Sequence, residues 1–291
     1  ALPYEPKYEA KVEVHELQAA LEAFDAVTVL PAGVLVITLG CDVQADRVEC
    51  SFWGWGLESQ CWLLQHEVVY GSPEHPATWR ALDEQTRREW THPSGHKLRV
   101  QCACVDAAYR QSFVMRYTSP RFRRNVFAVR GSPTLGKALM ESKPQIRGRP
   151  PGPLWFVGTN EAKDVIYQRL ELVREVLERG GPGPGATFPH GYIHLPLGTT
   201  PDFLAQLTAE DSSMKQLGGQ WFRAFENPDK RRNEALDMAV YALAGERYLN
   251  PQYAVIAAKL APPAPEGAPA PAKVEKRTVR KRVDRRRRWV V

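Results

Sequence analysis

Three consecutive segments in the first quarter of the chain carry the apolar patterns typical of β-strands. Residues 33–43 (GVLVITLGCDV) form a short apolar run with several β-branched residues, which indicates a buried strand. Residues 47–56 alternate, with Val48 and Cys50 on one face, and residues 59–71 form a third strand-like segment. Because only short polar links separate the three segments, they predict an antiparallel meander.

In the rest of the chain, segments with helical spacing of apolar residues alternate with segments typical of strands. The pattern predicts a helix at 74–90, a strand at 97–106, a helix at 108–119, a strand at 125–131, a strand at 154–158, a helix at 160–180, short strands at 192–196 and 220–225 around a helix beginning at Pro201, and a final helix at 231–249. Three antiparallel strands followed by helix, strand, helix and strand is the order of the RNase H-like fold. The predicted fold class is therefore α/β, with a mixed central sheet flanked by helices.

Composition divides the chain into a folded part and tethers. We expect an N-terminal linker at 1–31, one domain at 32–250, a Pro/Ala-rich linker at 251–272 and a basic tail at 273–291. The tail alone carries a net charge of +8, whereas the whole chain carries +6. Residues 1–272 therefore carry a net charge of −2. This distribution favours a nearly neutral body with a cationic arm over a fold that binds polyanions across its whole surface.

Several protein classes are excluded by what the sequence lacks. No apolar stretch approaches the roughly 18 residues that a membrane helix needs, and the first residues do not form an export signal. The five cysteines contain no C-x-x-C pair, which excludes a zinc ribbon and gives no disulfide framework.

Acidic residues stand at the ends of apolar elements. Asp42 and Asp106 end predicted strands, and Asp237 lies in the last helix with Glu234 one turn earlier. Each acid taken alone fits a turn start or a helix cap equally well. In an RNase H-like sheet, however, the first and fourth strands are neighbours, so their terminal acids come together. Such a cluster suits two Mg²⁺ or Mn²⁺ ions that clamp an in-line phosphodiester displacement.

The sequence resembles the C-terminal endonuclease domain of the large terminase subunit of lambda-type tailed phages. The resemblance covers roughly residues 30–250 and is carried by LGCDVQADRVECSFWGWG, VDAAYR, FVGTNEAKDVIYQRL, YIHLP, FLAQLTAE and RRNEALDMAVYALAG. It implies metal ligands on the first strand, a central strand and the last helix. These positions correspond to Asp42, Asp106 and Asp237, and less closely to Glu234.

The resemblance also implies a function and partners. We expect a divalent-metal-dependent endonuclease that cuts concatemeric viral DNA during packaging in the host cell cytoplasm. Its partners would be double-stranded DNA, the small terminase subunit and the procapsid portal, with no membrane. The basic tail suits either DNA or the portal. A non-catalytic DNA- or portal-binding module on the same scaffold is the main alternative, and an RNase H-like recombinase is a third.

The family's ATPase motor is expected to be missing from this chain. Only GSPTLGKA at 131–138 approaches a Walker A motif, and Ala138 replaces the Ser/Thr that would hold Mg²⁺, so no nucleotide cofactor is expected. Basic residues near the predicted active face are candidate DNA contacts, although a solvated surface explains them equally well. They are Lys137, Lys143, Arg147, Arg149, Arg231 and Arg232.

Overall fold

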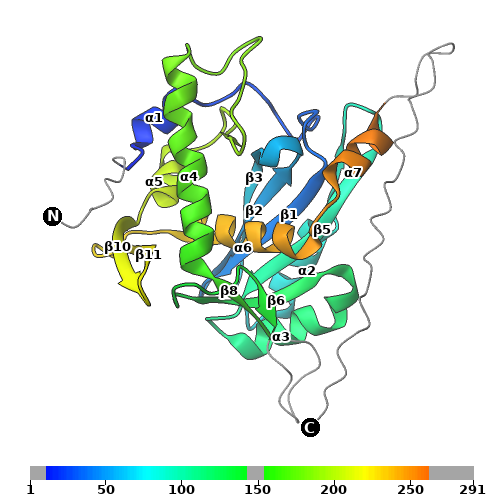
Figure 1. Ribbon diagram of the computed structural model, residues 1–291. Helices are drawn as coiled ribbons and strands as arrows, with labels where there is room; N and C mark the ends of the chain where they lie inside the picture. The colour runs from blue at the N-terminus through cyan, green and yellow to red at the C-terminus, as the bar shows by residue number, and fades with distance from the viewer. Residues whose placement is uncertain (1–10, 143–153, 262–291) are drawn as a thin grey trace, which may run out of the picture. The chain divides into compact units, whose positions relative to one another are not determined.

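A mixed β-sheet forms the centre of the computed structural model, which describes residues 11–142 and 154–261 (Figure 1). Its strands are β1 (Val36–Val43), β2 (Arg47–Trp55), β3 (Cys61–Tyr70), β4 (Glu89–Thr91), β5 (Lys97–Asp106), β6 (Val126–Ser132), β7 (Glu141–Ser142), β8 (Leu154–Gly158) and β9 (Ile193–His194). They run in the order β7-β8-β6-β5-β1-β2-β3-β9, and the short β4 pairs with β5.

The pairing directions confirm the predicted fold class. β1, β2 and β3 form the expected antiparallel meander. β5 lies parallel to β1, β6 lies parallel to β5, and β8 lies parallel to β6. The first and fourth predicted strands are therefore neighbours at the sheet centre, as in an RNase H-like fold.

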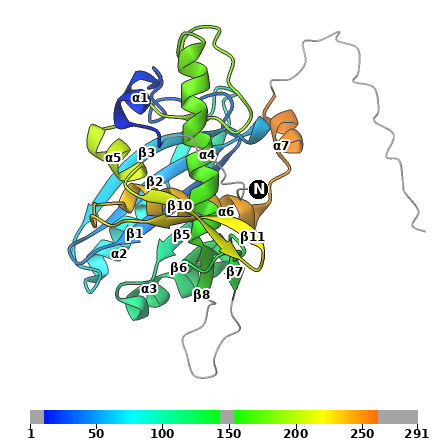
Figure 2. The ribbon, with the colours of Figure 1, turned by 60° about the vertical axis from the view of Figure 1, so that its left-hand side comes forward.

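Helices cover both faces of this sheet. They are α1 (Val14–Ala19), α2 (Pro76–Thr86), α3 (Gln111–Thr118), α4 (Thr159–Glu178), α5 (Pro201–Leu207), α6 (Glu234–Leu249) and α7 (Tyr253–Leu260), with 3₁₀ turns η1 (Leu57–Ser59) and η2 (Ser119–Arg124). One face packs against α1, α4, α5 and α6, and the other packs against α2 and α3 (Figures 1 and 2). Of the residues that the structure describes, no helix is both long and apolar enough to span a membrane.

The last long helix, α6, lies directly on the two central strands. Gly40 makes this close approach possible, since a Cβ at that position would lie 1.8 Å from the carbonyl oxygen of Met238. Two residues earlier, the Thr38 hydroxyl donates a 2.8 Å hydrogen bond to the carbonyl oxygen of Ala242. These contacts fix the height of α6 along β1 and therefore the position of its first turn.

Two segments assigned to linkers contain helices that pack against the domain. In the N-terminal segment, Leu17 of α1 is fully buried, and Glu16 pairs with Arg174 of α4 at 2.8 Å. At the other end, Tyr253 and Ile256 of α7 pack against the core. The prolines that indicated a linker begin only at residue 262, so the apolar run before them is free to form a helix.

The strand predicted at 220–225 is confirmed as β11 (Gln220–Glu226), but its partner was missed. β10 (Asp211–Leu217) pairs with it in a two-stranded hairpin. The sequence DSSMKQL lacks a clear apolar alternation, so the periodicity does not reveal a strand there. Gly218 and Gly219, both at positive φ, form the two-residue turn that closes the hairpin.

Candidate active site

Two aspartates end the central parallel strands on the same face of the sheet. Asp42 follows Gly40 on the face of β1 that packs against α6, and Asp106 follows Cys104 on the matching face of β5. Gly40 and Cys104 are paired in the parallel register. Because neighbouring strands lie about 4.8 Å apart, the two carboxylates lie beside each other at the C-terminal edge of the sheet.

The helix α6 brings a third carboxylate to this edge. Tyr241 donates its hydroxyl proton to Asp106 Oδ1 at 3.0 Å, so this turn of the helix is anchored at the end of β5. Asp237 lies one turn earlier on the same side, and Glu234 begins the helix. The charges of Asp106, Asp237 and Glu234 all act on Asp42. The four acids expected from the sequence therefore come together.

Burial raises the pKa values of the three aspartates. Burial, to 8% exposure, raises the pKa of Asp42 to about 7, and the neighbouring carboxylates add to the rise against a hydrogen bond from Gln44. Burial also raises the pKa of Asp106, although hydrogen bonds from Tyr241 and the backbone oppose it. For Asp237, burial raises the pKa to about 6, and Lys163 opposes the rise.

A lysine and a glutamate that the sequence did not single out complete the cluster. Lys163, near the start of α4, lies 2.6 Å from Glu210 Oε1 and 3.6 Å from Asp237 Oδ1. Asn233 donates to the same two carboxylates, at 2.8 and 3.3 Å. No spacing links these residues in the sequence, because they come from α4, from the loop before β10 and from the residue that precedes α6. Only the packing of α4 against α6 brings them together.

The cluster suits a hard divalent cation in its chemistry, although its side chains are turned towards protein partners. Throughout residues 11–142 and 154–261, no three His, Cys, Asp or Glu side chains form a ready-made ligand set. Asp42 accepts from Gln44, Asp106 from Tyr241, and Asp237 is held by Lys163. Carboxylate oxygens are the ligands that Mg²⁺ and Mn²⁺ prefer, and burial raises the pKa values of all three aspartates.

Comparison with known proteins identifies the family. Residues 1–257 match the sequence model described as terminase large subunit gpA, endonuclease domain. The chain belongs to this family. The resemblance found in the sequence is thereby confirmed.

Two phage proteins are similar to this terminase endonuclease domain. It is 32% identical over 226 residues to the large terminase subunit of Escherichia phage lambda, covering 75% of this chain and 33% of the phage protein. Identity to the large terminase subunit of Enterobacteria phage P21 is 28% over 225 residues, with the same coverage. The chain thus spans about one third of the length of these curated relatives.

Solved nuclease domains of the Sf6 large terminase subunit gp2 are also similar. A K428A mutant with manganese and β-thujaplicinol has a TM-score of 0.45 at 12% identity, covering 80% of this chain and 96% of that one. A second structure of the same nuclease domain has a TM-score of 0.43 at 12% identity, covering 80% of this chain and 97% of that one.

Three of the six candidate DNA contacts lie within the described residues, and all three are paired with carboxylates of the protein. Lys137 pairs with Glu141 at 2.9 Å, and the neighbouring Gly136 N–H donates to Glu161. Carboxylates thus contact two groups of the Walker-A-like segment. Arg231 lies 3.4 Å from Asp211, and Arg232 lies 3.0 Å from Glu49. Lys143, Arg147 and Arg149 lie outside the described residues, as does the basic tail.

Glu49 is a buried acid beside the site that the sequence alone did not reveal. It is 2% exposed, pairs directly with Asp42 across β1 and β2, and lies 2.7 Å from Arg47. Burial alone would raise its pKa, but hydrogen bonds from His66 and Arg47 lower it to about 2. Through Arg232, Glu49 also holds the segment that leads into α6 and therefore supports the position of Asp237.

Replacing Glu49 by glutamine is expected to destabilise the protein by about 2 kcal/mol at pH 7, since charge-assisted hydrogen bonds are lost. The folded pKa of about 2 lies below the reference value of 4.5. The stabilisation by Glu49 is therefore present above about pH 4.5 and is lost as the pH falls towards 2. Urea denaturation at neutral and acidic pH measures this. Glu226→Gln, at an exposed surface pair, is the control, and an equal loss in both variants would contradict the prediction.

Proposed function

We propose that this chain is a metal-dependent endonuclease domain that cuts concatemeric viral DNA during genome packaging. The observation that carries the proposal is the convergence of Asp42, Asp106 and Asp237, from β1, β5 and α6, at one edge of the sheet. Membership of the terminase endonuclease family supports it independently. Three buried acids with raised pKa values are costly for the fold, which favours a functional role over a structural one.

Each residue has a distinct part in the proposed mechanism. Asp42, Asp106 and Asp237 would hold two divalent ions, with Glu234 as a further oxygen donor at the rim. When bound, two such ions would activate a water and stabilise the leaving 3′ oxygen of a phosphodiester. Tyr241 orients the Asp106 carboxylate through its hydroxyl. Lys163 holds Asp237 and lowers its pKa, which keeps that side chain ionised at neutral pH.

The wider context belongs to the same proposal. The substrate would be double-stranded DNA, and the partners would be the small terminase subunit and the procapsid portal, in the cytoplasm of the infected host. The division into a nuclease domain, a Pro/Ala-rich linker and a basic tail is likewise proposed from composition. The tail's charge of +8 suits DNA by counterion release, and its apolar end WVV suits a protein partner.

Mn²⁺ and Mg²⁺ are expected to support nicking of supercoiled plasmid and to raise the melting temperature of the protein. At an ion concentration one hundred times the dissociation constant, binding stabilises a protein by about 2.7 kcal/mol. Differential scanning fluorimetry and plasmid cleavage, each with and without EDTA, measure the two effects. Asp106→Asn should lose both, whereas Asp229→Asn, at an exposed surface position, should lose neither.

A non-catalytic DNA- or portal-binding module is the second candidate function. It is favoured by the lack of a ready-made ligand set among the residues that the structure describes. DNA binding without cleavage, together with a melting temperature that does not change when Mn²⁺ is added, would support this module and refute the nuclease.

A further inference from the structure

Positive charge is concentrated on α3 and η2, on the face of the sheet opposite α6. Residues 110–124 contain five arginines and no acidic residue, although residues 1–272 as a whole carry −2. Arg116 and Arg123 of this segment are exposed. A local cationic surface on a nearly neutral body indicates a specific anionic ligand more than general attraction to polyanions.

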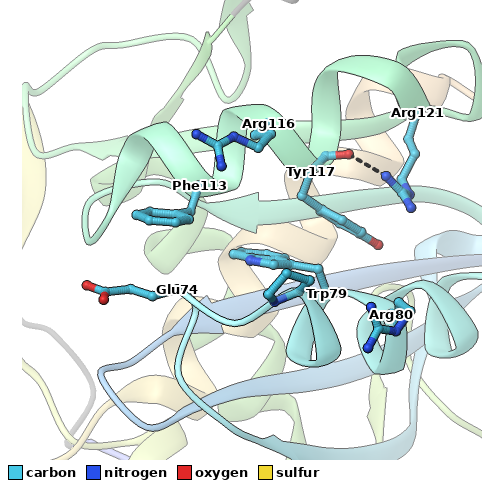
Figure 3. A pocket seen from close by; sticks show the side chains of 8 residues that line it. Glu74, Trp79, Arg80, Phe113, Arg116, Tyr117 and Arg121 are labelled. Carbon is cyan, nitrogen blue, oxygen red and sulfur yellow. Dashed lines mark hydrogen bonds between the residues drawn. The ribbon is translucent and has the colours of Figure 1, made fainter.

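A pocket of about 250 Å³ lies between α2 and α3 on this surface (Figure 3). It is lined by Glu74, Pro76, Trp79, Arg80, Phe113, Arg116, Tyr117 and Arg121. Figure 3 shows Phe113 and Arg116 on one side of the pocket, with Trp79 and Arg80 on the other. Pockets for drug-sized molecules begin at about 300 Å³, so this one suits a single ring with one charged group and not a longer segment.

The aromatic wall of the pocket is held in place by its own contacts. Trp79 and Tyr117 are stacked, with ring centroids 5.0 Å apart and an angle of 25° between the planes. The Trp79 indole N–H donates to the carbonyl oxygen of Pro73 at 2.7 Å. Phe113 is half-buried, with the guanidinium carbon of Arg116 5.4 Å from its ring centroid. A fixed aromatic surface is suited to stacking against a planar ligand.

The arginines of the pocket divide into fixed and available groups. Arg121 donates to Asp83 at 2.7 Å and to the carbonyl oxygen of Tyr117 at 2.8 Å, so it serves as a brace. The one acid in the lining, Glu74, is paired with Arg110 at 2.7 Å. Arg80 and Arg116 are exposed, and neither has an ion pair with another described residue. Two guanidinium groups are therefore available to an anion.

The pocket is close to the candidate active site along the chain. Phe113 follows Asp106 by seven residues, and seven residues span at most about 25 Å. Arg110 and Glu74 join the loop after β5 to the loop after β3, and both loops leave the sheet at the edge where Asp106 lies. A DNA strand advances about 3.4 Å per nucleotide, so the pocket is within reach of a strand held at the carboxylates.

We propose that the pocket between α2 and α3 binds an unpaired nucleotide of a DNA strand. Its base packs against the aromatic side chains of Trp79 and Phe113, and its phosphate contacts Arg80 and Arg116. Aromatic stacking with arginine contacts to the backbone is the usual means of holding single strands without sequence preference. The inference rests on the proposed function, because it states where the DNA of that reaction would be held away from the metal ligands.

The observations favour a nucleotide over an acidic peptide. A peptide carboxylate would need the arginines alone, and the ordered stack of Trp79 on Tyr117 would have no part in its binding. A nucleotide uses both the planar surface and the cationic groups. A free mononucleotide has the same chemistry as a nucleotide within a strand, so both sources are compared in the test.

Fluorescence anisotropy of the full chain with a labelled oligothymidylate, and with a blunt duplex of equal length, tests the site. Phe113→Leu keeps an apolar side chain but removes the ring, and should weaken oligothymidylate binding about tenfold. Arg116→Gln should weaken it and reduce the salt dependence by about one ion. Arg99→Gln, an exposed charge at the start of β5, is the matched control and should leave binding unchanged. Cleavage of plasmid should stay normal in Arg99→Gln.

Unlabelled thymidine monophosphate and a polyglutamate peptide serve as competitors. Competition by the mononucleotide that is lost in Phe113→Leu supports the nucleotide site. Equal oligothymidylate affinity in wild type and Phe113→Leu, or competition by polyglutamate alone, overturns it. If oligothymidylate binding depends on Phe113 and Arg116 but the protein does not cleave plasmid, the proposed nuclease is refuted and the nucleotide site is not. If the protein cleaves plasmid normally but oligothymidylate binding does not depend on these residues, only the nucleotide site is refuted.

Discussion

Replacing Asp42 by asparagine is expected to abolish DNA cleavage and, in the same protein, to raise the thermal stability of the metal-free state. Loss of partners that only support a metal ligand typically reduces activity by about 10–100-fold, so loss of a ligand itself should exceed about 100-fold. Asparagine keeps the volume of the side chain and an oxygen that can accept from Gln44. The substitution therefore removes the charge with little change in packing.

The gain in stability follows from the sign of the pKa shift. The pKa of Asp42 is about 7 in the folded protein, against a reference value of 3.8. The folded state therefore disfavours the ionised form, and its stability falls as the pH rises from about 4 towards 7. Since one pKa unit corresponds to about 1.36 kcal/mol, Asp42→Asn should remove a penalty of at most about 4 kcal/mol above pH 7.

Scanning fluorimetry across pH, combined with plasmid cleavage, measures both effects. For a domain of this size the melting temperature rises by roughly 2–4 °C per kcal/mol. Added Mn²⁺ should stabilise the wild type but not Asp42→Asn, which narrows the difference between them. Asp46→Asn, at the exposed turn after β1, is the control. A destabilised Asp42→Asn protein would show that Asp42 is a structural cap and would contradict its role in the site.

The strand ends of the candidate site were predictable because they obey local rules. The apolar run that ends at Asp42 and the run that ends at Asp106 each identify a buried strand, and the element order makes these strands neighbours. The period of two within each strand then decides which face the carboxylates share. Asp237 could be added because α6 has a strong helical pattern and begins with acids.

Other parts of the site and fold depend on contacts that no local pattern encodes. Lys163 looks like any polar residue at the start of an amphipathic helix, and only the packing of α4 beside α6 brings it to Asp237. Glu49 occupies an ordinary position in an alternating strand, yet it is buried because Arg47 and Arg232 neutralise it. The period of the sequence indicates which face of an element is buried. It does not indicate which charged residues will be buried together.

Lys163→Met is expected to be among the most destabilising single substitutions in the site. The Lys163 side chain is 12% exposed and Glu210 is 5% exposed, so the substitution leaves a buried carboxylate without its cation. Removing one partner of a buried pair typically destabilises a protein by about 3–5 kcal/mol. Lys215→Met, which removes a lysine from an exposed pair with Glu226, should change stability by at most about 1 kcal/mol.

The same substitution should shift the pH dependence of cleavage. Lys163 lowers the pKa of Asp237, which is otherwise raised by burial, so its removal raises that pKa further above about 6. Asp237 must be ionised to bind a cation, and the onset of cleavage should therefore move to higher pH. Adding Glu210→Gln removes the unpaired carboxylate and should restore most of the lost stability, since amide and methionine leave no buried charge. It should not restore the original pH profile, because Asp237 still lacks its cation. If the double variant recovers both, Lys163 acts only as the partner of Glu210 and has no direct part in keeping Asp237 ionised.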